Sequence, residues 1–193
     1  MTSDIKIVDD AKKQLSMHPK KFGLWLFIVT VVMIFASLTS AYIVRQAEGN
    51  WFVFELPWQM WATSGIIVLS SVSMHWAYIS AKRDNLESIK IAISITTILA
   101  VLFLVGQVYI WGLLVDENVF LVGNPSGSFL YILSGLHGLH IVSGVIFLLI
   151  VLNSTFKYKT HSKNLVQIEM CTTYWHFLGG LWIYLFIFLL LNH

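Results

Sequence analysis

The stretch TTYWHFLGGLWIYLFIFLLL, residues 172–191, contains no Asp, Glu, Lys or Arg and is long enough to cross a bilayer as one helix. His176 is its fifth residue and lies between aromatic residues and the glycines Gly179 and Gly180. A polar side chain is costly in hydrocarbon, so His176 is a candidate functional residue. The stretch indicates a membrane protein and raises the question of what this histidine does.

The composition of the whole chain agrees with a membrane protein. Of its 193 residues, 57% are hydrophobic and 11% are charged, and the mean hydropathy is +0.75. An ordinary soluble domain is far more polar. The uncharged runs between charged residues predict an all-α integral membrane bundle, with turn residues in GNPSGS, 123–128, dividing the longest run. The five predicted transmembrane helices lie at about 22–44, 58–81, 89–115, 128–155 and 167–191.

The basic residues predict how the bundle is oriented. All but one of the 12 Lys and Arg residues lie in the N-terminal segment or in the second and fourth connections, and Arg45 is the exception. Because basic residues mark the cytoplasmic side, the N-terminus is expected to be cytoplasmic and the C-terminus periplasmic. Residues 1–21 then form a cytoplasmic segment, with an amphipathic pattern at 3–16, and residues 22–193 form the membrane domain. The first hydrophobic run is too long for a cleavable signal and is interpreted as a signal anchor.

Polar residues share one face on each of the last two predicted helices. On the fourth, Ser134, His137 and His140 fall within one arc, and on the fifth Glu169 and His176 do so. Both histidine positions come out near the bilayer middle, so we expect His137, His140 and His176 to face one another. The third helix adds Gln107, and the deep tryptophans Trp175 and Trp182 are expected to pack against other helices.

The same residues could also be interpreted as a metal or haem site. A His-x-x-His pair can chelate, but a catalytic zinc site needs a third close ligand and an oriented second shell. Interhelical hydrogen bonding is therefore favoured, and no metal or cofactor is predicted in this chain. An autonomous haem protein and a small-solute transporter remain as alternatives. The transporter is disfavoured because the first three uncharged runs carry no titratable chain through the bilayer.

A functional role for the single thiol and binding of nucleic acid both find little support in the sequence. The single cysteine, Cys171, cannot form an internal disulfide, and ordinary packing is its simplest role. The net charge of +2 reflects the basic residues of the cytoplasmic side, and no nucleic-acid footprint is visible.

Five motifs in order resemble a known family. They are HPKKFGLWLF (18–27), LSSVSMHWA (69–77), AVLFLVGQVYIW (100–111), GSFLYILSGLHGLHIVSG (127–144) and IEMCTTYWHFLGGLWIYLF (168–186). Together they are similar to subunit III of the haem-copper oxidases, in its short five-helix bacterial form. The resemblance covers the chain from about His18 to its end.

The resemblance implies an accessory subunit of an aerobic terminal oxidase in the bacterial inner membrane. Such a subunit stabilises the catalytic subunit I and provides a lipid-lined cleft for oxygen access. It has no redox centre, and haem and copper belong to subunits I and II; phospholipids, a small subunit IV and a larger supercomplex are further implied partners. The alternative is a similar partner of a quinol oxidase or nitric oxide reductase. The residues expected to line or brace the cleft are His137, His140, His176, Glu169, Tyr174, Trp175 and Gln107.

Three positions depart from the family pattern, and each departure removes a carboxylate. The family's Thr-Glu-x-Met is Thr30-Val31-Val32-Met33 here, and its Gln-x-x-Glu-Trp has Ile110 in place of the glutamate. The aspartate that follows His-Phe-x is replaced by Gly179. Because a buried carboxylate is costly unless it is paired, the joint loss suggests that the three belong to one polar network.

Overall fold

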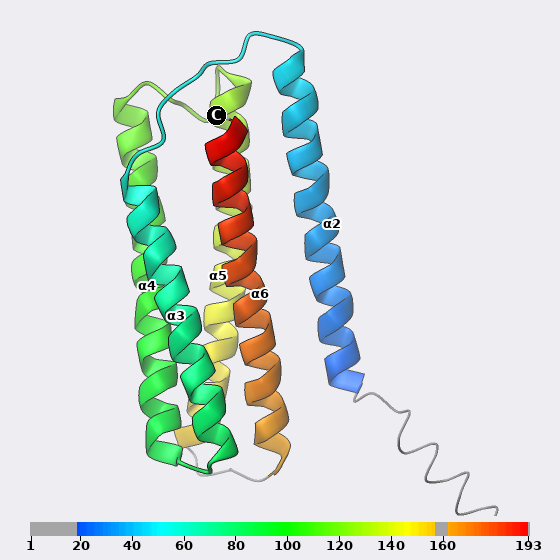
Figure 1. Cartoon of the computed structure of the whole chain (residues 1–193), viewed down its shortest axis with the longest axis vertical. Helices are drawn as coiled ribbons and strands as arrows, with labels where there is room; N and C mark the ends of the chain where they lie inside the picture. Colours follow the sequence, from blue (N-terminus) through cyan, green and yellow to red (C-terminus); the bar gives the residue numbers. More distant parts are fainter. Residues whose placement is uncertain (1–18, 157–161, 193) are drawn as a thin grey trace, which may run out of the picture.

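Residues 19–156 and 162–192 are described by a computed structural model, which places them in five α-helices (Figure 1). Consecutive helices run in opposite directions, so Pro19 and the C-terminal end of the last helix lie at opposite ends of the bundle (Figure 1). The amphipathic pattern at 3–16 lies outside the described residues. The helices are α2 (Pro19–Ala47), α3 (Gln59–Lys82), α4 (Leu86–Asp116), α5 (Pro125–Phe156) and α6 (Ser162–Asn192).

Four of these helices are long and apolar enough to cross a membrane. They are Pro19–Ala47, Leu86–Asp116, Pro125–Thr155 and Val166–Asn192. Helix α3 has the required length but carries five serines and His75, which lower its hydropathy. Its serines Ser64, Ser70, Ser73 and Ser80 are buried, and the first three form hydrogen bonds with α6 or α4. A fifth span at α3 therefore stays a prediction.

The fourth predicted transmembrane helix, which is α5 in the structure, begins earlier than the sequence pattern suggested. The turn chemistry of GNPSGS predicted a start near residue 128, whereas the helix starts at Pro125. Proline suits the first helical position because its missing N–H needs no partner there. The Asn124 side chain accepts a hydrogen bond from the backbone N–H of Ser126 (3.0 Å), and Gly123 has a φ of 128°. The turn thus lies at Gly123 and Asn124, and Ser126–Ser128 belong to the helix.

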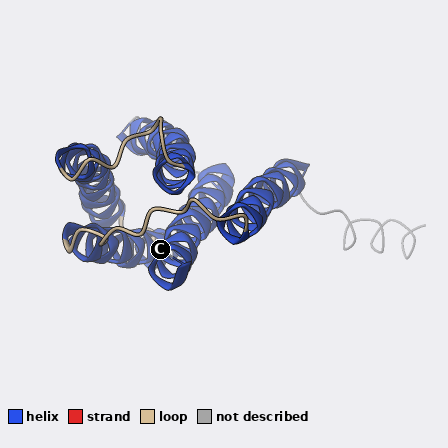
Figure 2. Cartoon of the chain, turned by 90° about the horizontal axis from the view of Figure 1, so that it is seen from above, coloured by secondary structure: helices blue, strands red, loops and turns tan. Residues whose placement is uncertain are grey.

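Helices α3 to α6 form a closed group of four, and α2 packs on its outside. Helix α3 contacts α4 and α6, and α5 contacts the same two helices. Within the described residues, α2 contacts α5 and α6 and stands at one edge of the molecule when it is seen from above (Figure 2). Because lipid tails are as apolar as leucine, packing and hydrogen bonds must hold such helices together.

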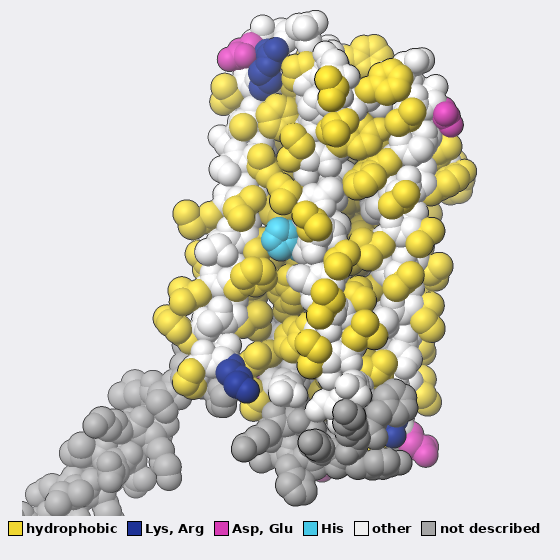
Figure 3. All heavy atoms as spheres, turned by 180° about the vertical axis from the view of Figure 1, so that it is seen from behind, with side chains coloured by type: hydrophobic (Ala, Val, Ile, Leu, Met, Phe, Trp, Pro, Cys, Tyr) yellow, Lys and Arg dark blue, Asp and Glu magenta, His cyan; other side chains and the backbone are white. Residues whose placement is uncertain are grey.

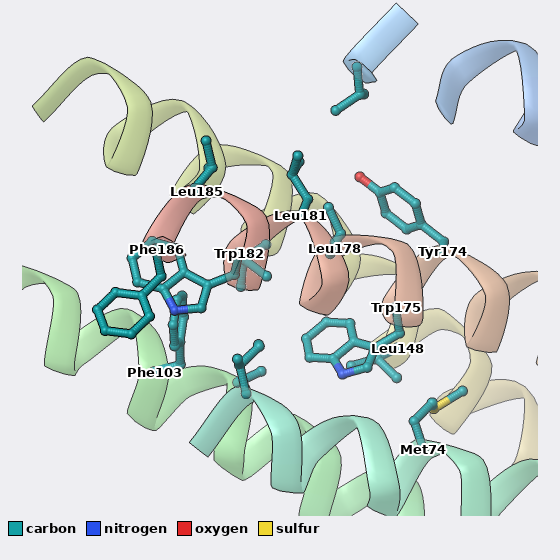
Figure 4. Close-up of a cluster of buried hydrophobic side chains, with 14 of the residues drawn as sticks. Met74, Phe103, Leu148, Tyr174, Trp175, Leu178, Leu181, Trp182, Leu185 and Phe186 are labelled. Atoms are coloured by element: carbon teal, nitrogen blue, oxygen red, sulfur yellow. The ribbon is translucent and has the colours of Figure 1, made fainter. Parts of the chain in front are cut away.

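Two tryptophans of α6 provide hydrogen bonds to α3. The Trp182 indole N–H donates to Ser64 Oγ (3.0 Å), and the Trp175 indole N–H donates to Ser70 Oγ (3.1 Å). Both rings are buried on the side of α6 that faces α3 (Figure 4). Trp182 also packs edge-on against Phe103 of α4, with ring centroids 5.0 Å apart. The predicted packing of both tryptophans against other helices is confirmed.

Helix α4 approaches α3 closely around Gly106. A Cβ atom at Gly106 would lie 2.7 Å from Thr63 Cγ2 of α3. Thr63 cannot easily rotate away, because its hydroxyl donates to the Met60 carbonyl (3.1 Å) and accepts from Gln107 Nε2 (3.2 Å). Glycine at 106 therefore allows this close approach.

Most of the lateral surface is apolar. In Figure 3 hydrophobic side chains cover the middle of the visible face, and Lys, Arg, Asp and Glu lie near its two ends. Val72 of α3 and Val105 of α4 are more than half exposed. This distribution is what a surface in contact with lipid requires, so the described part of the chain has the surface of a multi-pass membrane protein.

Gly106→Ala is expected to destabilise the bundle. The added methyl group must push α4 away from Thr63, at a cost of about 1–3 kcal/mol for overpacking. The thermal midpoint of the purified protein in detergent should fall. Gly112→Ala, on the same helix with no neighbouring atom within 4 Å, is the matched control and should not lower it. Equal midpoints for the two variants would contradict the close α3–α4 contact.

Candidate functional site

The residues predicted to form one site lie in three places. The first is the contact of α2 with α5 and α6, which we call the α2 seam. It contains Phe27 and Phe35 of α2, His137 and His140 of α5, and Tyr174 of α6. Phe35 lies against both histidine rings, with centroids 6.4 Å from His137 and 5.6 Å from His140.

His137 of α5 is completely buried. Its ring lies 5.2 Å from that of Trp182 and 6.0 Å from that of Phe103, centroid to centroid, with Phe35 on a third side. Neither ring nitrogen has a hydrogen-bond partner among the described residues. The histidine thus fills space between aromatic rings of α2, α4 and α6, at the cost of buried unpaired nitrogens.

His140 and Tyr174 make the polar contacts of the α2 seam. His140 Nδ1 lies 2.7 Å from the Leu136 carbonyl oxygen, which can only accept, so this nitrogen carries the proton. The Tyr174 hydroxyl lies 2.7 Å from Ser143 Oγ of α5. Phe27 packs on both the His140 and Tyr174 rings, at 6.4 and 5.7 Å between centroids. The Tyr174–Ser143 contact joins α6 to α5, and Phe27 packs α2 against both helices.

Polar contacts also fasten α2 to α6 at both ends of the seam. At one end Lys21 Nζ lies 2.7 Å from Glu169 Oε2, and both side chains are about one-third exposed. At the other, the Tyr42 hydroxyl (3.0 Å) and Gln46 Nε2 (2.9 Å) donate to the Asn192 carbonyl. The predicted site residue Glu169 is thus an ion-pair partner of α2.

Gln107 and Trp175 lie in the second place, between α3 and its neighbours. Gln107 Nε2 donates to Thr63, and Trp175 donates to Ser70. Gln107 is 3% exposed, and its side-chain oxygen has no partner among the described residues. Both residues connect helices of the four-helix group and lie away from α2.

His176 is in the third place. Its ring packs against that of His75 on α3, with ring centroids 5.8 Å apart. Among the described residues, it makes no other contact with an aromatic or histidine ring. The structure thus brings His137 and His140 together against Phe35, whereas His176 points to a different neighbour. The sequence pattern placed His176 on a polar face but could not say which helix that face meets.

The three positions without carboxylates all lie in the interior. Val31 and Ile110 are each 1% exposed, and Gly179 is buried. A Cβ atom at Gly179 would lie 2.8 Å from Ser71 Oγ, so α6 and α3 approach closely there. Apolar side chains at two positions and a helix contact at the third replace groups that would need buried partners.

Two hollows flank α2. The outer cavity, about 840 Å³ and wide open, lies between the C-terminal half of α2 and the start of α5. The α2–α6 groove, about 410 Å³, is almost entirely apolar. The outer cavity is lined by Ser37, Ser40, Ala41, Val44, Arg45, Glu48, Gly123, Asn124, Pro125, Ser128 and Phe129. The groove is lined by Val32, Phe35, Ala36, Phe177, Gly180, Leu181 and Tyr184.

Several of these contact residues were not singled out from the sequence. Phe27 and Phe35 had no signal that distinguishes them from lipid-facing apolar residues. Lys21 is one of the N-terminal basic residues that predicted the orientation, and His75 is not among the predicted site residues. The one available signal was Arg45, the lone basic residue on the predicted outer side, which now lines the outer cavity.

An apolar helical bundle with polar contacts between its helices defines a multi-pass membrane protein. Among the described residues, no three His, Cys, Asp or Glu side chains lie together as a metal site would require. The family model for cytochrome c oxidase subunit III matches residues 8–192. The chain belongs to this family, the third subunit of haem-copper oxidases, and the resemblance in its motifs is confirmed.

Individual relatives cover most of the chain. Subunit 3 of the cytochrome bo(3) ubiquinol oxidase of Buchnera aphidicola subsp. Schizaphis graminum is 29% identical over 93% of this chain and 97% of the relative. Cytochrome c oxidase subunit 3 of Synechocystis sp. is 31% identical over 88% of this chain and 75% of the relative. Cytochrome c oxidase subunit 3 of Corynebacterium diphtheriae is 28% identical over 86% of this chain and 84% of the relative. Relatives of both oxidase types are therefore similar to this chain.

His137→Leu is expected to stabilise the isolated protein. Leucine fits an apolar site between Phe35, Phe103 and Trp182, and it removes buried nitrogens whose lack of partners costs about 1–3 kcal/mol. The thermal midpoint in detergent should rise. His137→Asn is the matched control, because it keeps unpaired polar atoms at the same position. Its thermal midpoint should not rise. A fall for His137→Leu would mean that the imidazole has a stabilising partner.

Proposed function

We propose that this chain is a non-catalytic accessory subunit of a bacterial terminal oxidase of the inner membrane. It spans the membrane with five helices, its N-terminus in the cytoplasm and its C-terminus in the periplasm. Haem and copper are held by the partner subunits I and II. The observation that carries the proposal is the family match over residues 8–192, nearly the whole chain.

The proposed role is to stabilise subunit I and to hold phospholipid in a cleft through which oxygen reaches it. The features that support a lipid site are the two hollows beside α2. The α2–α6 groove offers apolar rings at mid-helix, where an acyl chain would lie. The outer cavity offers serine hydroxyls and Arg45 near a helix end, where a headgroup would lie.

Arg45 retains donors for such a headgroup. Its Nη1 contacts Glu48 Oε2 (3.1 Å) and the Gly49 carbonyl (3.4 Å). A guanidinium has five N–H donors in a planar fork that matches a phosphate. The remaining donors can therefore bind a phospholipid phosphate beside the hydroxyls of Ser37 and Ser40, which line the same cavity.

A quinol oxidase is the second candidate for the assembly. The relative from Buchnera aphidicola is named as a subunit of a ubiquinol oxidase. A relative from Staphylococcus saprophyticus, which is 24% identical, is named probable quinol oxidase subunit 3. The electron donor is chosen by other subunits, so this chain fits either assembly.

Purification through a tag on this chain in mild detergent is expected to recover a haem-copper subunit I. The same purification from cells that lack the subunit I gene is the control. The recovered complex should oxidise either reduced cytochrome c or a quinol, and comparing the two donors identifies the assembly. A chain that reproducibly purifies without any haem-copper subunit would contradict the proposal.

Arg45→Gln is expected to reduce the phospholipid that co-purifies with the complex and to shorten its working lifetime. Loss of a charge-assisted hydrogen bond of about 1.5–3 kcal/mol weakens lipid binding roughly tenfold or more. Lipid phosphorus per complex and the decay of oxygen consumption during turnover measure the two effects. Arg83→Gln, the same substitution at the C-terminal end of α3, is the matched control. Unchanged lipid content and unchanged decay would exclude this lipid site.

A further inference from the structure

The paired histidines His75 and His176 are unusual because they lie on the outside of the bundle. His75 is exposed and His176 is partly exposed. Histidines within membrane helices almost always face the bundle interior or a water-filled cavity, where they find partners. Among the described residues, neither ring of this pair forms a hydrogen bond, so their nitrogens are free to bind a ligand.

The geometry of the pair suits coordination of one ion. The ring centroids are 5.8 Å apart, and the rings are inclined by 52°. An ion bound to two imidazole nitrogens at about 2.0–2.1 Å holds the ring centres roughly 5–6 Å apart, depending on the angle at the metal. The two ligands come from different helices that are fixed relative to each other by the Trp175–Ser70 hydrogen bond (3.1 Å). The pair therefore needs little rearrangement to chelate.

The position of the pair allows water to reach it. His75 precedes Lys82 at the end of α3 by seven residues, and His176 follows the Lys21–Glu169 ion pair by the same number, so each lies roughly 10 Å along its helix from a charged level. Local thinning of the bilayer and water defects hydrate polar groups at such a depth. Water can thus fill the coordination positions that the protein leaves open.

We propose that His75 and His176 form a two-histidine site for a divalent transition-metal ion such as Cu²⁺ or Zn²⁺. Imidazole ligands suit these ions, whereas Mg²⁺ and Ca²⁺ prefer oxygen. No third His, Cys, Asp or Glu joins the pair among the described residues, so the protein supplies two ligands. The site is separate from the α2 seam and does not depend on the proposed function.

Cu²⁺ alone is the probe for this site, with the full chain purified in detergent. His18, His161 and His193, which lie outside the described residues, are first replaced by glutamine to remove competing imidazoles. The expected result is one Cu²⁺ per chain, with an electron paramagnetic resonance spectrum that shows coupling to two nitrogens. Zn²⁺ should displace it.

Single variants locate the bound ion. His75→Gln and His176→Gln should each weaken Cu²⁺ binding by about tenfold or more, since loss of a direct ligand costs no less than loss of an outer partner. Each should also remove one nitrogen from the spectrum. Tyr78→Phe keeps the ring that packs on His75 (6.3 Å) and should leave binding unchanged. No saturable binding, or equal binding in both histidine variants and their parent, would overturn the proposal.

Discussion

The hydrogen bonds from Trp175 and Trp182 of α6 to Ser70 and Ser64 of α3 determine how the rest of the bundle is arranged. The two tryptophans are seven residues apart, so they leave the helix in nearly the same direction and fix the rotation of α6. Neighbouring residues then point about 100° to either side. Tyr174 faces α5 and α2, where it meets Ser143 and Phe27, and His176 turns the opposite way to His75. Indole and hydroxyl are well suited to this task, because each has a polar group on a compact body that packs without charge.

Helix α2 depends on this arrangement and is held more loosely than the other helices. Its middle rests on the histidines of α5 through Phe35, and its ends are fastened to α6 by the Lys21–Glu169 pair and by Tyr42. Between these points the contact with α6 leaves an apolar groove, and the contact with α5 leaves the outer cavity. A helix attached at a few points, with space on both sides, is a suitable element for lipid or another subunit to pack against. This is why the proposed lipid role rests on α2 and not on the four-helix group.

The sequence predicted the helices well but predicted their partners poorly, and the reason is physical. Charged residues are excluded from the hydrocarbon, so the uncharged runs mark the helices, and the predicted ends lie within five residues of the observed ones. Periodicity places Glu169 and His176 on one broad face of α6, but that face spans two neighbours, and Glu169 meets α2 while His176 meets α3. Which helix lies beside which depends on contacts such as Gly106 against Thr63, and a single sequence carries little information on them. Phe35 was missed for a related reason, since buried and lipid-facing apolar residues have the same composition.

The neutral positions Val31, Ile110 and Gly179 bear on where this subunit can act. Among the described residues, no Asp, Glu, Lys or Arg is buried, and the buried polar groups are hydroxyls, an amide and an imidazole. Gly179 adds a steric reason, because a side chain there would meet Ser71 of α3. Neutral groups hold helices together but do not carry a fixed charge that could bias a proton or an electron nearby. The hollows beside α2 and the exposed faces of the four-helix group are the surfaces that lipid or another subunit can contact.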